Sequence, residues 1–284
     1  MSEAAQTNQL LGHPPDARLL IVNADDFGMC HSINQATIRA IREGLASSCT
    51  LMLPCPWSLH GIDLLKDNPD IPFGVHLTVV CEHARYKWRP VTWSESVASL
   101  RDESGYYCSY ERIDEFVEEA KLAELEVEFR GQIETVLQKG LRPTHLDSHC
   151  HVHTRREAIF DMVVDLAREY GLAVRANTRP LIEKLQEQGY PANGHDVLDS
   201  YRLETKDKPS VYHKLLRALP PGLTEWAVHP GIKSAELQAM EPTWEVRQAD
   251  FNFLVSQEAR EIIEQEEIVV LNYEPLQKAW QEQS

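Results

Sequence analysis

Basic charge is scarce in this sequence. Its 284 residues include 28 Lys and Arg against 44 Asp and Glu, which gives a formal net charge of -16. No basic stripe interrupts the acidic background, so neither nucleic acid nor an anionic membrane is an expected partner. No apolar run approaches the roughly 18 residues of a transmembrane helix. The first 17 residues lack a basic region followed by an apolar core, and we therefore expect a soluble, cytoplasmic protein.

Cysteine patterns and repeats are also missing. The six cysteines form no Cys-x-x-Cys pair and lack the density of a disulfide scaffold, which predicts free and mostly buried thiols. No internal repeat, linker-like shift in composition or low-complexity segment divides the chain. At 43% apolar residues it can bury a full core. We expect a polar N-terminal leader over residues 1–18 and a single catalytic domain over residues 19–284.

Short apolar strands alternate with amphipathic helices along this domain. Strands are predicted at 19–22, 48–53 and 73–78, in a short stretch that follows Pro143, at 172–175, near 197, at 224–228 and at 268–271. Helices are predicted at 32–43, 59–66, 113–139, 155–170, 180–188 and 210–219, in two stretches of 245–265, and at the chain end. This alternation favours an α/β fold, a (β/α) barrel of seven or eight parallel strands. A doubly wound open sheet would give the same alternation.

One long segment, residues 80–110, has no clear periodicity. It contains Tyr86, Trp88 and Trp93. Loops of this length in compact domains are usually functional or disordered. Because ligand pockets favour aromatic side chains, these residues are interpreted as a rim over the strand ends on which a ligand could stack, with Trp88 as a candidate contact. The alternatives are that they fold back into the core or form a subunit contact.

The densest polar pattern is the run from His145 to His153, HLDSHCHVH, which places four histidines and one aspartate within nine residues. In an extended strand, alternate side chains share a face, so all five polar residues would point the same way. The two ends would then lie roughly 26 Å apart, too far to bind one ion. The chain must therefore bend within the run, and only part of it can coordinate.

Other ionisable residues end different predicted strands. Asp25 and Asp26 end the first, His76 the third and His229 a late one, while His149 belongs to the run. In a parallel barrel these strand ends meet at one mouth. Asp26, His76 and His149 would supply three ligands for a divalent ion and leave a position for water. Taken singly, His76 could be a hydrogen-bonded core residue and Asp26 a helix cap.

The remaining polar residues of this region receive supporting roles. His145, Asp147, His151 and His153 are candidates for orienting His149 or lining the mouth. Arg175, at the end of the fifth predicted strand, could hydrogen-bond substrate or neutralise Asp25.

Four motifs occur in the order found in the YdjC-like carbohydrate deacetylases, which this sequence resembles from about residue 19 to residue 273. They are VNADDFG at 22–28, GVHL at 74–77, THLDSHCHVH at 144–153 and VHP at 228–230. Within that family the closest named activity is chitooligosaccharide deacetylase. The resemblance implies a barrel related to polysaccharide deacetylases, one divalent ion such as zinc or magnesium, a carbohydrate substrate and hydrolysis of its N-acetyl group. The resemblance also makes a homodimer a possible assembly.

By position, the resemblance implies Asp26, His76 and His149 as metal ligands and Asp25 as general base. Asp25 would need a turn to face the same mouth as Asp26, because neighbours in a strand point apart. His229 is the candidate acid for the leaving amine. Two alternative hypotheses remain. The protein could be another metal hydrolase on this scaffold, acting on a cyclic amide or phosphoester, or a non-catalytic metal- or carbohydrate-binding protein. Clustered phosphate-binding glycines are absent, which disfavours the phosphoester.

Overall fold

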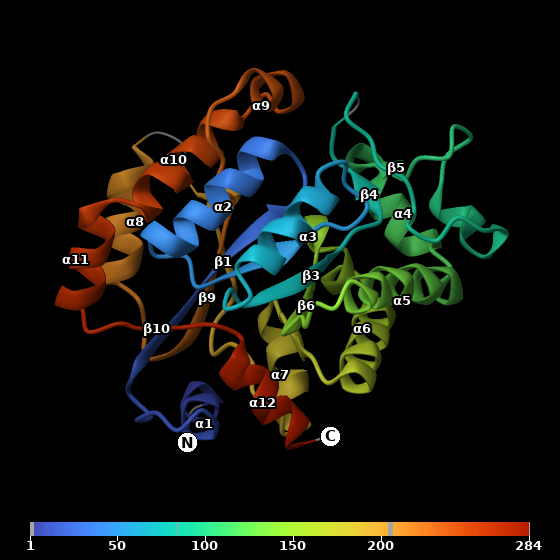
Figure 1. The fold of residues 1–284 in the computed structure, drawn as a ribbon. Helices are drawn as coiled ribbons and strands as arrows, with labels where there is room; N and C mark the ends of the chain where they lie inside the picture. The colour runs from blue at the N-terminus through green and yellow to red at the C-terminus, as the bar shows by residue number, and fades with distance from the viewer. Residues whose placement is uncertain (1–2, 84, 204–206, 284) are drawn as a thin grey trace.

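A curled sheet of parallel strands forms the centre of the computed structural model, which describes residues 3–83, 85–203 and 207–283 (Figure 1). Its strand order is β7-β6-β3-β2-β1-β9-β8, and β10 pairs with the first part of β1. The strands are β1 (Arg18–Phe27), β2 (Ser48–Leu51), β3 (Phe73–Leu77), β6 (His145–Ser148), β7 (Ala173–Val174), β8 (Leu198–Asp199), β9 (Gly222–Val228) and β10 (Val269–Leu271). Around the sheet the strands follow chain order from β1 through β2, β3 and β6 to β7, and from β8 through β9 back to β1, as in a barrel. Among the described residues, no ladder joins β7 to β8, so the barrel is open there.

Helices surround the sheet on its outer side (Figure 1). Those that cover it are α2 (His31–Glu43), α3 (Ser58–Asp67), α5 (Leu122–Gln138), α6 (Glu157–Tyr170), α7 (Arg179–Glu187), α8 (Lys208–Arg217), α10 (Trp244–Leu254), α11 (Gln257–Gln265) and α12 (Glu274–Gln281). In α6, for example, Ile159, Val163 and Ala167 recur at helical spacing and are buried, and Gly171 ends the helix in the left-handed region. The predicted α/β barrel is confirmed in this curled, open form. None of the described helices has both the length and the apolar character of a membrane span.

Three local predictions were wrong or incomplete. The helix expected over 113–139 is two helices, α4 (Ile113–Glu119) and α5, because Ala120 leaves helical geometry. Nη1 of Arg156 donates to three carbonyl oxygens at this break, including that of Ala120 at 3.0 Å, which satisfies the end of α4. The N-terminal leader contains a helix, α1 (Glu3–Leu10), fixed by Thr7 Oγ1 donating to the carbonyl of Ala192 at 2.8 Å. A short helix, α9 (Ala235–Met240), was not expected.

The described residues of the segment 80–110 are held by a small parallel ladder and by the buried side chain of Trp88. The ladder joins β4 (Val80–Cys81) to β5 (Cys108–Ser109), and the 3-10 helices η1 (Glu95–Leu100) and η2 (Tyr110–Arg112) lie within or just beyond the segment. Trp88 is 2% exposed and its Nε1 donates to the carbonyl of Val80 at 2.9 Å. Trp88 is therefore a core residue, and its predicted place on an exposed rim is wrong.

A single carboxylate on α5 anchors this segment. Glu128 is fully buried and accepts hydrogen bonds from the backbone nitrogens of Val91 and Thr92, both at 2.9 Å. It also accepts from Tyr107 Oη at 2.5 Å and Gln132 Nε2 at 2.8 Å. The carboxylate of Glu128 thus joins three parts of the structure: the backbone at residues 91–92, Tyr107 and α5.

Candidate active site

The end of β1 turns two consecutive carboxylates toward the same cavity. Asp26 has φ +67°, in the left-handed region that side chains rarely adopt, and the β1–β2 register shifts between Ala24 and Phe27. This irregularity is the turn that the sequence required, because Asp25 and Asp26 would otherwise point to opposite faces. Both side chains are buried, at 3% and 2% exposure, and both line the cavity.

Three side chains from distant strands meet beside this turn. Oδ1 of Asp26 lies 3.4 Å from Nε2 of His76 and 3.1 Å from Nδ1 of His149. One ligand atom from each of the three residues can lie within 4.8 Å of the others, and all three side chains are buried. This is a carboxylate and two imidazoles, a donor set that suits zinc and similar divalent ions. The residues predicted as ligands therefore form a buried group that could hold a metal ion.

Neighbouring groups fix the orientation of these ligands. Nδ1 of His76 lies 2.7 Å from Oδ1 of Asp147, so a proton on Nδ1 would leave Nε2 free to face Asp26. Nη2 of Arg247 donates to Oδ2 of Asp26 at 2.8 Å, which leaves Oδ1 for an ion. Burial alone would lower the pKa of His76, but the carboxylates of Asp147, Asp26 and Asp25 outweigh it and raise that pKa to about 9. Positive charge at this position is strongly favoured.

Arg175 is buried among three carboxylates. Its guanidinium binds Asp25 through two nitrogens, at 2.7 and 2.8 Å, and lies 2.8 Å from Asp147 Oδ2 and 2.7 Å from Glu225 Oε1. Burial would raise the pKa of Asp25, but the charge and hydrogen bonds of Arg175 outweigh it, and the net shift is downward. Arg175 is 1% exposed and is not part of the cavity lining, so its charge is directed at these buried carboxylates. The group Asp25, His76 and Asp147 could also hold an ion by geometry, but this guanidinium already binds both of its carboxylates.

The histidine run bends as predicted. β6 ends at Ser148, and the following η3 (His149–Thr154) contains two left-handed residues, Cys150 at φ +55° and His151 at φ +56°. This bend brings His151 to the cavity, where its Nε2 lies 3.2 Å from Oδ2 of Asp199.

The other two histidines of the run are buried away from the cavity lining. The ring of His145 stacks on Tyr273 at 3.5 Å, and a Cβ at Gly74 would lie only 2.6 Å from that ring, so the glycine makes room for it. His153 lies between Ser148 Oγ at 2.6 Å and the carbonyl of Arg175 at 2.8 Å. The sequence suggested that both residues could line the mouth, but neither of them does.

His229 follows β9 and lines the cavity beside η4 (Ser200–Arg202). Its Nδ1 lies 2.9 Å from Ser200 Oγ, its ring meets Tyr201 edge-on at 4.7 Å, and its backbone nitrogen donates to Asp250 at 2.8 Å. No described residue forms a hydrogen bond with its Nε2, which remains available to a ligand. The imidazole also lies near enough to Asp199 to help lower the pKa of that carboxyl, which burial would raise.

The cavity at these strand ends has a volume of about 400 Å³ and is rich in ionisable groups. It is lined by Asp25, Asp26, His76, Glu82, Tyr110, Ser148, His149, Cys150, His151, Arg155, Asp199, Tyr201, Arg202, His229 and Thr243. Acids and imidazoles from six separate positions along the chain, 25–26, 76, 82, 149–151, 199 and 229, thus share one space.

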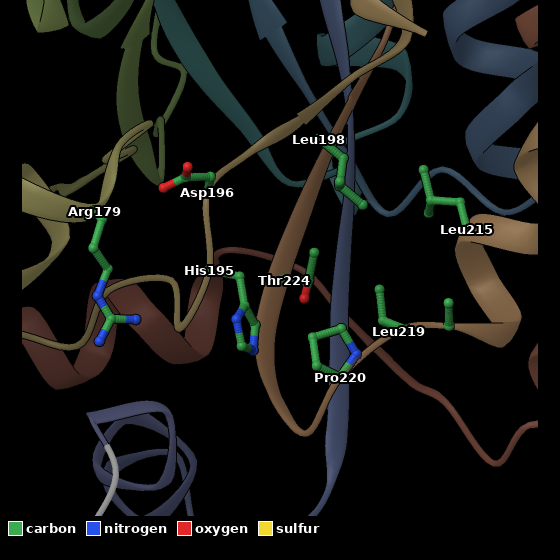
Figure 2. A pocket seen from close by; sticks show the side chains of 9 residues that line it. Arg179, His195, Asp196, Leu198, Leu215, Leu219, Pro220 and Thr224 are labelled. Atoms are coloured by element: carbon green, nitrogen blue, oxygen red, sulfur yellow. The ribbon is translucent and has the colours of Figure 1, made fainter. Parts of the chain in front are cut away.

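A second cavity, of about 570 Å³, lies at the opposite end of the sheet (Figure 2). Thr224, near the start of β9, lines it, whereas His229 follows the end of that strand. Leu198, Leu215 and Leu219 give it a largely apolar wall. Its lining includes one imidazole and one acid, His195 and Asp196, whereas the first cavity gathers a larger group of imidazoles and carboxylates.

Two residues of the site had no sequence signal of their own. Glu82 follows β4, and its Oε2 lies 2.8 Å from Nε2 of His149. Arg247 comes from α10, beside Gly231, where a Cβ would lie 2.9 Å from the arginine Cβ. Trp88 also supports the site, because its ring packs edge-on against that of His149 at 5.8 Å. For Arg247 the sequence offers one hint: a glycine, Gly231, follows the VHP motif, and a glycine can mark a place where another segment packs closely.

Fold and site together define a class of protein: an open α/β barrel with a buried His/Asp group that could bind a metal ion, at the carboxyl ends of its strands. The family model described as YdjC-like protein matches residues 19–265, and the chain belongs to this family.

Relatives with assigned names lie at about 30% identity. Carbohydrate deacetylases from Enterococcus faecalis (31% identical, 90% of this chain and 97% of the relative) and Clostridium beijerinckii (29%, 90% and 99%) match most of the chain. A chitooligosaccharide deacetylase from Yersinia enterocolitica is 34% identical over 62% of this chain and 64% of its own. A crystal structure from Enterococcus faecalis V583, of a protein proposed to cleave cellobiose phosphate, superposes with a TM-score of 0.78 at 28% identity, covering 92% of this chain and 99% of that one.

Proposed function

We propose that this protein removes the N-acetyl group from an acetylated amino sugar or oligosaccharide and releases acetate. One divalent ion, zinc, magnesium or similar, would be held by Asp26 Oδ1, His76 Nε2 and His149 Nδ1. The observation that carries the proposal is the meeting of these three buried atoms at a cavity that also contains Asp25 and His229. The names of the relatives support the reaction class.

The residues present fit such an ion. Each imidazole uses one nitrogen toward Asp26, while its other nitrogen lies near a carboxylate: Asp147 beside His76, and Glu82 beside His149. This pattern of carboxylate, histidine and metal is common in enzymes. When bound, the ion would polarise the acetamide carbonyl and lower the pKa of water.

The chain's own groups would then move the protons. Asp25, kept ionised by Arg175, accepts a proton from the attacking water at a carboxylate oxygen. His229 donates a proton from Nε2 to the departing amine, because its Nδ1 is engaged by Ser200. Asp199 lies 3.2 Å from Nε2 of His151 and lines the same cavity as His229, so a carboxylate faces this side of the site. The amide thus ends as acetate and a free amine.

The test is elemental analysis of the purified protein combined with an acetate-release screen over N-acetylated mono- and oligosaccharides. We expect about one divalent ion per chain and acetate release that a chelator abolishes and added metal restores. A cyclic amide, a phosphoester and a disaccharide phosphate belong in the same screen. Turnover of one of these without acetate release from any sugar would refute the deacetylase assignment, and an ion coordinated by four protein ligands without water would favour a structural role.

A further inference from the structure

His149 presents its second ring nitrogen to another set of donors. Nε2 of His149, a carboxylate oxygen of Glu82 and the sulfur of Cys150 can all lie within 4.8 Å of one another. In a continuous strand Cys150 would point away from its neighbour. The left-handed backbone at Cys150, φ +55°, brings the thiol and the imidazole together instead.

The nitrogen in this group lacks a well-aligned hydrogen bond. His149 is 4% exposed, and its Nε2 is buried. The carboxylate of Glu82 lies 2.8 Å away, within ion-pair distance, but it is not aligned as a hydrogen-bond acceptor. Buried polar atoms normally find a partner. All three residues line the same cavity, so a cation could enter.

We propose that Glu82, His149 Nε2 and the Cys150 thiolate form a second cation position, selective for zinc or cobalt over magnesium. Carboxylate, imidazole and thiolate are common zinc ligands, and thiolate is a poor ligand for magnesium. Filling the position releases the thiol proton of Cys150 to solvent as the metal–sulfur bond forms.

The two positions exclude each other because a neutral imidazole has one free lone pair. With a cation on Nδ1, the proton of His149 sits on Nε2 and faces Glu82. With a cation on Nε2, the proton sits on Nδ1 and can be donated to Asp26 Oδ1, 3.1 Å away. A thiophilic cation at the second position therefore withdraws His149 from the first. The resulting inhibition of turnover rests on the proposed function, whereas the binding itself does not.

Cobalt titration of the metal-free protein tests the binding, because thiolate ligation gives a sulfur-to-cobalt charge-transfer band. The band should appear in the wild type, vanish in Cys150→Ser and persist in Cys108→Ser, a matched control at another partly buried thiol. Cys150→Ser should still bind cobalt at the first position, which shows that the variant folds. Asp26→Asn, by weakening the first position, should raise the thiolate-bound fraction several-fold. A wild type without the band, or a band retained in Cys150→Ser, overturns the proposal.

A second measurement tests the coupling. The protein is activated with magnesium or manganese and zinc is then added in excess. The zinc concentration that halves each variant's own rate should rise about tenfold or more in Cys150→Ser and stay unchanged in Cys108→Ser. Equal sensitivity of Cys150→Ser and the wild type would refute the exclusion. A cobalt–thiolate band in a protein that deacetylates no sugar would refute the proposed function and leave the cation position standing.

Discussion

Arg175 binds both carboxylate oxygens of Asp25, with Nη1–Oδ2 at 2.7 Å and Nη2–Oδ1 at 2.8 Å. Asn23 Nδ2 donates to the same carboxylate at 2.8 Å. The proposed role of Asp25 as a base needs a fixed direction toward the proton that it accepts, and these contacts hold its carboxylate at the edge of the cavity.

Asp25→Asn should lower the turnover number by about 10²- to 10⁴-fold and leave metal content unchanged, because the amide cannot accept a proton. The measurement is acetate release together with metal per chain. Asp63→Asn, at an exposed carboxylate of α3, is the control. Near-normal turnover of Asp25→Asn would show that another group is the base.

Asp147→Asn should weaken metal binding by about 10- to 100-fold, because the carboxylate that orients His76 becomes an amide of similar shape. The dissociation constant, measured by competition with a chelating dye, is the readout. Asp63→Asn should bind as tightly as the wild type. If Asp147→Asn did too, the orientation of His76 would not depend on Asp147.

Arg175→Met should reduce the free energy of unfolding by about 3–5 kcal/mol, because Asp25, Asp147 and Glu225 would lose their shared cation in a buried region. Urea denaturation of the metal-free protein measures the change. Arg130→Met is the matched control, since Arg130 forms ion pairs with Glu169 and Glu126 at the surface. For Arg130→Met we expect the free energy of unfolding to fall by about 1 kcal/mol or less. A similar loss in both variants would contradict this view of Arg175.

Two buried histidines make stability depend on pH. Burial lowers the pKa of His145 to about 3 and that of His153 to about 4, below the value near 6.5 of an unfolded chain. Both are therefore neutral in the folded state while the unfolded chain takes up protons. Their contribution is fully present above about pH 6.5 and is lost as pH falls toward 4 and 3.

His145→Phe tests this dependence. It should keep the stacking on Tyr273 and reduce the slope of unfolding free energy against pH, between pH 6 and 4, by up to about 1.4 kcal/mol per pH unit. The comparison is made in the presence of chelator, so that metal binding does not contribute. His31→Gln, at an exposed histidine, is the control. An unchanged slope in His145→Phe would show that this residue does not couple folding to protons.

Glu128→Ala should loosen the segment 80–110, because four donors that now bind its carboxylate would lose their partner. We expect a loss of about 1–3 kcal/mol in stability and faster proteolytic cleavage within the segment. Glu126→Ala, at an exposed residue of the same helix, should change neither. Protection equal to the wild type in Glu128→Ala would show that the segment is held by other contacts.

The barrel was predictable because apolar strands and amphipathic helices are local patterns, and the three proposed ligands stood out as ionisable residues at the ends of such strands. Glu82 and Arg247 were not predictable, since their relation to His149 and Asp26 exists only after the chain has folded. His145 and His151 share a face in an extended strand. Only the end of β6 and the left-handed bend after it decide that one is buried and the other reaches the cavity.

The left-handed backbone at Asp26 restricts what could replace it. Apart from glycine, asparagine and aspartate are among the few residues that enter this region readily, and β-branched or bulky side chains are strongly disfavoured there. An attempt to alter the proposed metal site by placing glutamate at position 26 would meet a conformational penalty before any coordination chemistry. Redesign of this site for another metal therefore has more freedom on β3 and at the end of β6 than at the turn that follows β1.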